Sequence, residues 1–237
     1  MKGIIGYTGF VGSNLIEKME FDRMFNSKNI ENVLDDDYEL LVCSGISARK
    51  WYANQYPEKD LENINNLIGY LKNVKCEKLI LISTIDTCLE VLEPYGSNRL
   101  HAEVELQKIF KNKLSIVRLP SIFGKNLKKN VLFDLINNKL YQPINLCDSH
   151  QWYYLGNLGD DLTYVLNEGI SEINLFSEPI MIKEIVYQFF NVSPHNLYSD
   201  SDSAIKYDFN TNIHSMKYWN TKEDIIKKLK KYINGEG

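Results

Sequence analysis

The chain has 237 residues, of which 44% are hydrophobic and 24% charged, an ordinary composition for a globular protein of one large domain. Its net charge of −4 and the lack of an uncharged apolar stretch of bilayer-spanning length argue against nucleic-acid and membrane partners. Glycines interrupt the apolar N-terminus, so we expect no signal peptide, and the scattered cysteines lack metal-binding spacing. We therefore expect a cytoplasmic protein with buried free thiols and no metal site.

The first 120 residues alternate short apolar runs with helical patterns. The runs predicted to form strands, the second of them brief, are at 2–6, 22–26, 39–45, 78–84 and 114–120. The segments with helical spacing of apolar residues are at 11–19, 57–73 and 95–112. Continuous apolar strands separated by helices indicate a parallel sheet covered on both faces. We therefore predict an α/β fold with a Rossmann-like, doubly wound parallel sheet.

The residues beyond about 121 are less regular. A late strand is predicted at 172–176 and a last helix at 221–233, where Thr221 and Asp224 come close to a capping box. We interpret the whole chain as a single domain, 1–237. Its organisation would be a dinucleotide-binding core, 1–120, followed by a reduced C-terminal substrate lobe mixed with the final core elements, 121–237.

A glycine-rich loop follows the first strand and precedes the first helix. Its glycines let the backbone turn tightly and approach a pyrophosphate, which the free N–H groups of the following helix would also contact. The three-residue spacing differs from the G-x-G-x-x-G fingerprint, and a glycine-rich turn without a ligand is the alternative. The loop residues expected to contact a dinucleotide are Gly6, Thr8, Gly9, Phe10, Val11 and Gly12.

The end of the second strand lacks the acidic residue that usually binds the ribose of NAD. Asn26, Ser27 and Lys28 stand there instead. A serine and a lysine can bind a 2′-phosphate that an acid would repel, which favours NADP over NAD without excluding NAD. Asp22 and residues 35–37 are alternative acids, but we expect them before the strand and on a solvated loop.

The carboxyl ends of parallel strands meet at one edge of a sheet, where ligands bind. This places function after the strands that end near Gly6, Cys43, Ile82 and Leu119. The further cofactor-binding candidates at these strand ends are Ser44, Gly45, Ile46, Ser83, Leu119 and Pro120. Ser47 and Arg49, slightly beyond the third strand, are substrate candidates.

The stretch PYGSNRL, 94–100, begins the third helix. Tyr95 and Arg99 lie one helical turn apart on the same face. The spacing fits an ordinary helix start, with Pro94 in the first turn and a surface arginine. It also fits a catalytic Tyr-x-x-x-Lys pair with arginine in the lysine position.

Four motifs, GYTGFVGSNL, STIDTC, YGSN and VRLPSIFG, occur in the order found in extended short-chain dehydrogenase/reductases. The chain resembles this NAD-dependent epimerase/dehydratase group over roughly residues 1–180. The resemblance implies a Rossmann fold, a nicotinamide cofactor and hydride transfer on a small molecule, a sugar or a nucleotide sugar. It also implies a homodimer formed through the helices at 57–73 and 95–112.

The resemblance assigns roles to individual residues. Thr84, or alternatively Ser83, would orient the substrate oxygen, and Tyr95 would exchange a proton with it. Arg99, in the position of the family's lysine, would lower the pKa of the tyrosine and bind the nicotinamide ribose. Asn63 matches the family's asparagine more loosely.

Two features differ from the family's pattern. Arg99 keeps a positive charge, but its guanidinium is broad, planar and almost never deprotonated. Only ten residues separate Thr84 from Tyr95, where family members carry a longer segment. These differences favour a second hypothesis, a non-catalytic NAD(P)-binding sensor or assembly protein, beside the leading hypothesis of an enzyme.

The later half contributes the remaining substrate candidates. Lys129 and Asn130 follow the segment that opens the substrate lobe in the family, and nearby lysines could bind the diphosphate of a nucleotide sugar. A solvated loop is the alternative interpretation. Gln151 and Tyr153 lie in HQWYYLGNLGDDL, which resembles the segment that returns to the core. We assign none of the four histidines to catalysis or metal binding.

Overall fold

The computed structural model describes residues 1–140, 142–213 and 215–236, so His214 lies outside the described residues. The chain forms two compact units. The first consists of Met1–Leu119 and Gly156–Asn174, and the second of Pro120–Leu155 and Leu175–Gly237. The chain thus leaves the first unit after the fifth strand of the sheet and later returns to add one helix and one strand.

The first unit is built on a parallel sheet of six strands in the order β10-β5-β4-β3-β1-β2. In chain order the strands are β1 (Lys2–Ile5), β2 (Arg23–Phe25), β3 (Asp37–Cys43), β4 (Lys75–Thr84), β5 (Leu114–Leu119) and β10 (Glu172–Asn174). The order reverses at β1, from which the chain first moves outward to β2 and then across to β3. This arrangement confirms the predicted α/β class with a Rossmann-like, doubly wound sheet.

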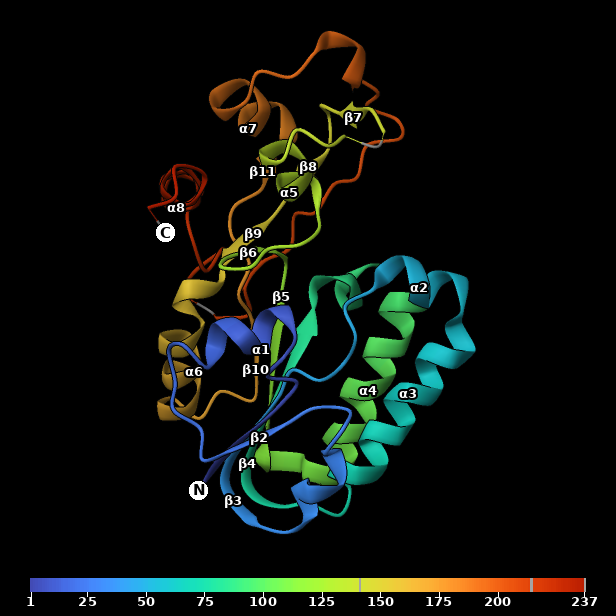
Figure 1. The fold of residues 1–237 in the computed structure, drawn as a ribbon, viewed down its shortest axis with the longest axis vertical. Coiled ribbons are helices and arrows are strands. Elements are labelled where there is room, and N and C mark those ends of the chain that lie inside the picture. Colours follow the sequence, from blue (N-terminus) through green and yellow to red (C-terminus); the bar gives the residue numbers. More distant parts are fainter. Residues whose placement is uncertain (141, 214, 237) are drawn as a thin grey trace. The chain divides into compact units, whose positions relative to one another are not determined.

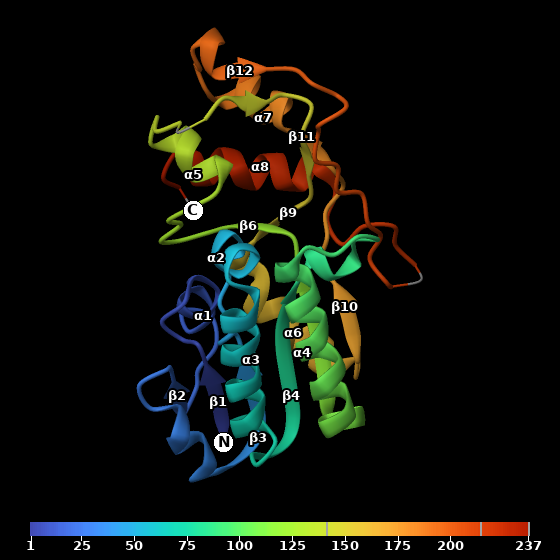
Figure 2. The ribbon, with the colours of Figure 1, turned by 90° about the vertical axis from the view of Figure 1, so that its right-hand side faces the viewer.

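Helices cover both faces of this sheet. They are α1 (Phe10–Leu15), α2 (Lys50–Gln55), α3 (Pro57–Leu71), α4 (Pro94–Phe110) and α6 (Leu158–Asn167). Short 3-10 helices are η1 (Ile30–Leu34), η2 (Ile85–Cys88), η3 (Lys111–Lys113) and η4 (Leu155–Asn157). Figure 1 shows α3 and α4 side by side on one face, with α1 and α6 on the other, and Figure 2 views the first pair from the front.

The core between the sheet and α3 and α4 explains why these segments fold as they do. Leu79 and Leu81 of β4 are fully or almost fully buried, and they belong to one cluster with Leu71 of α3 and with Leu106 and Phe110 of α4. The alternate side chains Ile80 and Ile82 are buried as well, as expected for a strand covered on both faces. These apolar runs therefore form strands whose side chains are buried on both faces of the sheet.

Most element boundaries differ by a few residues from the sequence prediction, and two differences concern α1 and α2. The first helix ends at Leu15 instead of continuing to residue 19, and it is followed by turns in which the N–H groups of Lys18 and Met19 donate to the Leu15 carbonyl. A short helix, α2, precedes α3, and no periodic apolar pattern indicated it because Ala53 is its only buried residue. This helix carries residues that matter for the site below.

The second unit is built from short strands and helices around an aromatic core. Its elements are β6 (Ser121–Phe123), α5 (Val131–Ile136), β7 (Ile144–Asn145), β8 (Ser149–His150), β9 (Trp152–Tyr154), β11 (Ile180–Met181), α7 (Ile182–Phe189), η5 (Pro194–Asn196), β12 (Leu197–Tyr198) and α8 (Lys222–Ile233). Fully buried Phe123, Trp152 and Tyr153 come from the paired strands β6 and β9. Helix α8 begins with the predicted cap, in which Thr221 accepts a hydrogen bond from the N–H of Asp224.

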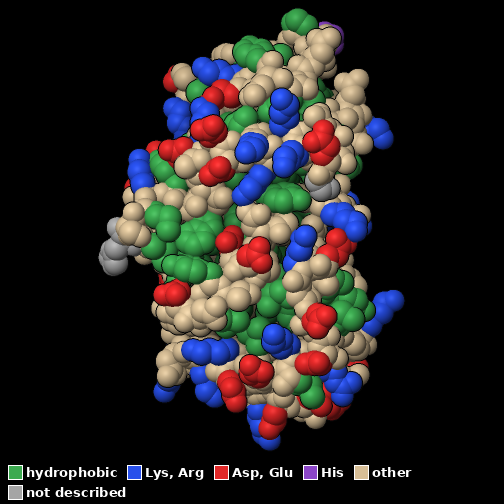
Figure 3. Space-filling view, turned by 90° about the vertical axis from the view of Figure 1, so that its left-hand side faces the viewer, with side chains coloured by type: hydrophobic (Ala, Val, Ile, Leu, Met, Phe, Trp, Pro, Cys, Tyr) green, Lys and Arg blue, Asp and Glu red, His purple; other side chains and the backbone are tan. Residues whose placement is uncertain are grey.

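Charged side chains of both signs are interspersed on the face drawn in Figure 3. Among residues 1–140, 142–213 and 215–236, no helix combines the length and apolarity needed to cross a membrane. Within the same ranges, no three His, Cys, Asp or Glu side chains gather in a way that could hold a metal ion.

Candidate functional site

The glycine loop is packed so tightly that side chains are excluded from it. Gly6 has φ of +90°, and a Cβ there would lie 2.5 Å from the Ser44 carbonyl oxygen. A Cβ at Gly12, inside α1, would lie 2.2 Å from the Gly6 carbonyl oxygen. The loop from β1 therefore lies directly against the backbone that follows β3. Gly9 precedes α1, is exposed and donates its N–H to Gly6.

A cavity of about 360 Å³ opens beside this loop, at the carboxyl ends of the strands of the first unit. It is bordered by the segments after β2 and β3 and by one side of α3. Its apolar walls include Ile5, Ile46 and Leu67, and Asn26 and Ser27 add polar groups. Ser47, Arg49 and Asn63 also line it. Apolar walls with a few polar groups suit the adenosine half of a dinucleotide, so the donors and the glycine cradle fit the implied cofactor.

The residues after β2 shape one end of this cavity. The Asn26 side chain accepts the N–H of Lys28 and donates to the Tyr7 hydroxyl at 3.2 Å. These bonds hold the turn, while the Ser27 and Lys28 side chains remain exposed. Ser44 donates its hydroxyl to the Ile5 carbonyl at 3.0 Å and thereby joins the ends of β1 and β3. Two of the predicted contacts, Asn26 and Ser44, therefore support the loops of the cavity.

Thr84 and Tyr95 come together at the end of the central strand. Thr84 is the last residue of β4, and Tyr95 lies in the first turn of α4, where the Asn54 side chain accepts its N–H at 2.9 Å. Burial raises the pKa of Tyr95 above its ordinary value, and the Arg99 guanidinium opposes that increase. A hydrogen bond with the Thr84 side chain also lowers the pKa of Tyr95. A tyrosine hydroxyl can act as a proton donor or acceptor in general acid–base chemistry.

Arg99 lies inside the protein, with 3% of its side chain exposed. Its guanidinium forms a bidentate ion pair with Asp60 of α3, whose side chain is 4% exposed, and it donates to the Ser47 carbonyl. The centre of the guanidinium lies 4.0 Å from the Tyr95 ring centroid. Arg99 therefore joins α4 to α3 and to the segment after β3, and it stacks on the tyrosine whose pKa it lowers.

Asp60 is the most important residue of this site that the sequence did not indicate. It also accepts a hydrogen bond from the Asn98 side chain at 2.9 Å, so one buried carboxylate binds two residues of α4. In the sequence Asp60 stands among the acids at the start of a helix, where solvated carboxylates are common. Its distance of 39 positions from Arg99 gave no local pattern that could reveal the pair.

Ser83 belongs to a different network. Its hydroxyl donates to the buried Glu103 of α4 at 2.5 Å, and Glu103 forms an ion pair with Arg118 of β5 at 2.6 Å. Arg118 reaches Glu172 of β10 with its other terminal nitrogen at 2.6 Å. The network connects three strands and one helix, so the structure points to Thr84 as the hydroxyl beside Tyr95 and gives Ser83 a structural partner.

The remaining substrate candidates lie in the second unit, and Pro120 begins it directly after Leu119, the end of β5. Asn130 caps α5 by accepting the N–H of Phe133 at 3.0 Å. The Gln151 amide donates to the carbonyls of Ser177 and Phe209, at 2.6 and 2.8 Å. Asn130 and Gln151 thus have structural partners within this unit. Tyr153 is fully buried, and Lys129 is exposed.

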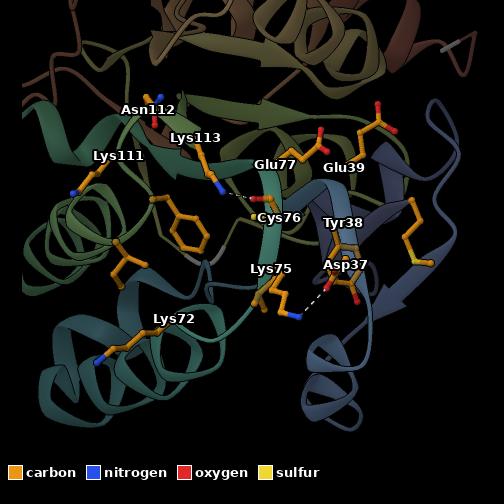
Figure 4. A pocket seen from close by; sticks show the side chains of 14 residues that line it. Asp37, Tyr38, Glu39, Lys72, Lys75, Cys76, Glu77, Lys111, Asn112 and Lys113 are labelled. Carbon is orange, nitrogen blue, oxygen red and sulfur yellow. Dashed lines mark hydrogen bonds and ion pairs between the residues drawn. The ribbon is translucent and has the colours of Figure 1, made fainter.

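A second, wider cavity of about 720 Å³ lies at the opposite, amino ends of the strands. Figure 4 shows it lined by Lys72, Lys75, Lys111 and Lys113 together with Asp37, Glu39 and Glu77. Lys113 donates to the Cys76 carbonyl at 3.1 Å. Because ligands of open α/β sheets bind at the carboxyl ends, this mixed-charge surface is not the candidate site.

Comparison with solved structures identifies similar folds. A dTDP-4-dehydrorhamnose reductase from Yersinia enterocolitica matches with a TM-score of 0.72 and 10% identity, over 100% of this chain and 99% of the other. The enzyme of the same name from Bacillus anthracis, solved in complex with NADP, matches with a TM-score of 0.66 and 17% identity, over 84% of each chain. The chain has the fold of these reductases.

The capsular polysaccharide assembling protein CapF from Staphylococcus aureus also shares this fold, with a TM-score of 0.60 and 19% identity. The match covers 79% of this chain but spans only 58% of the CapF chain. No protein-family model matches the sequence, and no curated protein matches it. The resemblance to the epimerase/dehydratase group, seen in four short motifs, is thus confirmed at the level of the fold.

Proposed function

We propose that this chain is an NADP-dependent enzyme that transfers a hydride between the cofactor and a carbon of a sugar or nucleotide sugar. The observation that carries the proposal is the placement of Thr84 at the end of β4 and of Tyr95 in the first turn of α4, which packs against β4 and η2. The glycine loop and the 360 Å³ cavity, which would hold the cofactor, lie at the same edge of the sheet.

The bound nicotinamide would donate or accept the hydride. Thr84 would hold the substrate oxygen by a hydrogen bond, and Tyr95 would give that oxygen a proton during reduction or take one during oxidation. A buried phenol is a weak base at neutral pH, so Tyr95 needs positive charge nearby to act in the second direction. Arg99 supplies such a charge from the ring side of Tyr95.

The preference for NADP is based on the segment after β2 and on Arg49. The one carboxylate among the described residues that line the cavity, Asp60, is paired with Arg99, and Arg49 lines the same cavity. Arg49 stacks on Tyr52 with its guanidinium 5.1 Å from the ring centroid and reaches the Ser47 hydroxyl at 3.4 Å. A guanidinium and a serine hydroxyl form the kind of donor set that binds a 2′-phosphate.

The first experiment measures binding and then turnover. NADP and NAD, each in both redox forms, are titrated into the protein, and nucleotide sugars are then screened for heat stabilisation of the complex. A ligand at a hundredfold excess over its dissociation constant should add about 2.7 kcal/mol of stability.

Tyr95→Phe should abolish turnover and leave NADP binding within about twofold, because the change removes only the phenolic oxygen. Tyr164→Phe, at a tyrosine of α6 that is 39% exposed, is the matched control and should retain activity. Full activity in Tyr95→Phe would overturn the assigned role.

A second candidate function is a non-catalytic NAD(P)-binding sensor or assembly protein. The observation that favours it is the buried ion pair between Arg99 and Asp60. This pair gives Arg99 a structural role inside the protein in place of the ligand contact that the family's lysine makes. Arg99→Lys should raise turnover in a slow enzyme and change nothing in a protein that only binds the cofactor. We also propose that α3 and α4 pair across a two-fold axis in a homodimer, which sedimentation of the purified chain would test.

A further inference from the structure

A second cation, Lys50, is linked to Thr84 through Asp86. Lys50, the first residue of α2, places its Nζ 2.8 Å from Oδ1 of Asp86 in η2. The Asp86 side chain is 10% exposed, whereas that of Lys50 is 42% exposed. The carboxylate is thus held inside the protein, and the ammonium reaches it from the surface of the first unit.

Asp86 connects this cation to the hydroxyl pair. Its Oδ2 accepts a hydrogen bond from Oγ1 of Thr84 at 3.3 Å, and its backbone N–H donates to the same hydroxyl oxygen at 3.3 Å. The Thr84 hydroxyl is also among the groups that lower the pKa of Tyr95. Lys50, Asp86 and Thr84 are therefore linked directly. The first turn of α4, which carries Tyr95, packs closely on Asp86, because a Cβ at Gly96 would lie 2.8 Å from the Asp86 carbonyl oxygen.

The two cations near Tyr95 are held in different ways. Arg99 is fixed by two Asp60 oxygens and the Ser47 carbonyl, so its terminal nitrogens are already used within the protein. Lys50 has one close carboxylate and a more distant one, Glu93, whose Oε2 lies 3.6 Å from Nζ. The Lys50 side chain is 42% exposed and that of Arg99 is 3% exposed, so the two cations differ in their access to solvent.

We propose that Lys50 is a positioning residue of the site, which holds Asp86 and through it Thr84 to orient the Tyr95 hydroxyl, and whose own charge stabilises the Tyr95 phenolate. The catalytic meaning of this role rests on the proposed function. In the Tyr-x-x-x-Lys pattern, the lysine four residues after the tyrosine stabilises the phenolate. In this chain Arg99 of α4 stands at that position, and the proposal gives the role to Lys50 of α2.

The charges around the Tyr95 hydroxyl determine the direction of each effect. The charged groups that act on the pKa of Tyr95 are Arg99, Asp86 and Lys50. Asp60 pairs with Arg99, and Glu93 lies near Lys50. Burial raises the pKa of Tyr95, Arg99 and Lys50 lower it, and Asp86 raises it. Removal of Lys50 alone should raise the pKa of Tyr95 further, because the negative charge of Asp86 is then no longer offset by the lysine. Removal of the Asp86 charge should lower the pKa of Tyr95.

The test titrates position 95 directly and needs no substrate. Tyr95 is replaced by a difluorotyrosine, whose acidity brings its titration below that of the lysines, and fluorine NMR follows its ionisation. Lys50→Met should raise its apparent pKa by about half to one unit, the effect of one charge several ångströms away in a partly solvated site. Asp86→Asn should shift it downward, and the double variant should lie between the two. Lys50→Arg, which keeps the charge, should remain near the unsubstituted background.

Lys108→Met is the matched control, because Lys108 forms an exposed ion pair with Glu105 elsewhere in the first unit and should leave the titration unchanged. Shifts in the same direction for Lys50→Met and Asp86→Asn, or no shift in either, would overturn the inference. Once a substrate is found, the pH profile of kcat should move to higher pH in Lys50→Met and be rescued by Lys50→Arg. If the titration shifts as expected and no nucleotide sugar is turned over, the proposed function fails while the electrostatic inference stands.

Discussion

The ion pair between Asp60 and Arg99 allows the most direct test of the site's construction. Asp60→Asn keeps the shape of the side chain but removes its charge, and Arg99 is left buried without a counter-ion. Both side chains are almost fully buried, with exposed fractions of 4% and 3%. In the unsubstituted protein Arg99 and Asn98 donate hydrogen bonds to the carboxylate oxygens of Asp60. In the variant one of these oxygens is replaced by an amide nitrogen, which cannot accept them.

The expected cost follows from the behaviour of buried ion pairs. Removal of one partner typically destabilises a protein by about 3–5 kcal/mol, because the remaining charge cannot return to water. For a chain of this size, about 2–4 °C of melting temperature is lost per kcal/mol, so Asp60→Asn should melt roughly 6–20 °C lower. The double variant Asp60→Leu/Arg99→Met, which leaves neither charge buried, should lose less than the sum of the single variants.

Urea unfolding followed by circular dichroism measures these differences, and Lys108→Met serves as the exposed-pair control, for which no measurable change is expected. If Asp60→Asn unfolds at the same urea concentration as Lys108→Met, the pair contributes no structural stability. Arg99 would then be available to a ligand, as the Tyr-x-x-x-Lys pattern implies.

Three further predictions concern the cofactor site and the core. Gly12→Ala should abolish NADP binding in a calorimetric titration, because its Cβ would lie 2.2 Å from the Gly6 carbonyl oxygen and the loop must move. Arg49→Met should weaken NADP binding about tenfold or more and leave NAD binding nearly unchanged, and equal losses for both would refute the 2′-phosphate role. Burial raises the pKa of Cys43 from 9.0 to about 11, so its contribution to stability is complete below pH 9 and is lost as the pH rises toward 11. Cys43→Ala should therefore flatten the alkaline fall of the unfolding free energy by up to about 1.4 kcal/mol per pH unit, whereas Val42→Ala should lower stability without changing the slope.

The fold could be predicted because its strands are buried on both faces. A run such as residues 78–84 is continuously apolar only if neither side of it meets water, and such strands separated by helices form a parallel sheet. Helix α2 escaped prediction for the opposite reason. It has six residues and buries only Ala53, so its sequence carries no apolar period.

The site was partly predictable because strand ends are local features of the sequence. Thr84 and the loop at residues 6–12 each follow an apolar run directly, so their positions at the edge of the sheet followed from the strand pattern. The positions of Asp60 and Lys50 could not be predicted in this way, because each is separated from its counter-ion by 36 to 39 positions of sequence. Long-range ion pairs leave no spacing in a sequence, and only the packing of α2, α3 and α4 brings them together.

The arginine in α4 and the short connection before it are better understood together than as two separate departures. A planar fork can satisfy both oxygens of Asp60 and the Ser47 carbonyl at once, which one ammonium cannot do with the same geometry. Held in this way, the Arg99 guanidinium stacks on the ring of Tyr95. The ten residues between Thr84 and Tyr95 contain η2, which places Asp86 against Thr84 and within reach of Lys50. Tyr95 thus has a structural cation over its ring, and a second, more exposed cation is linked to Thr84 through Asp86. An arginine in the lysine position therefore does not by itself argue against catalysis.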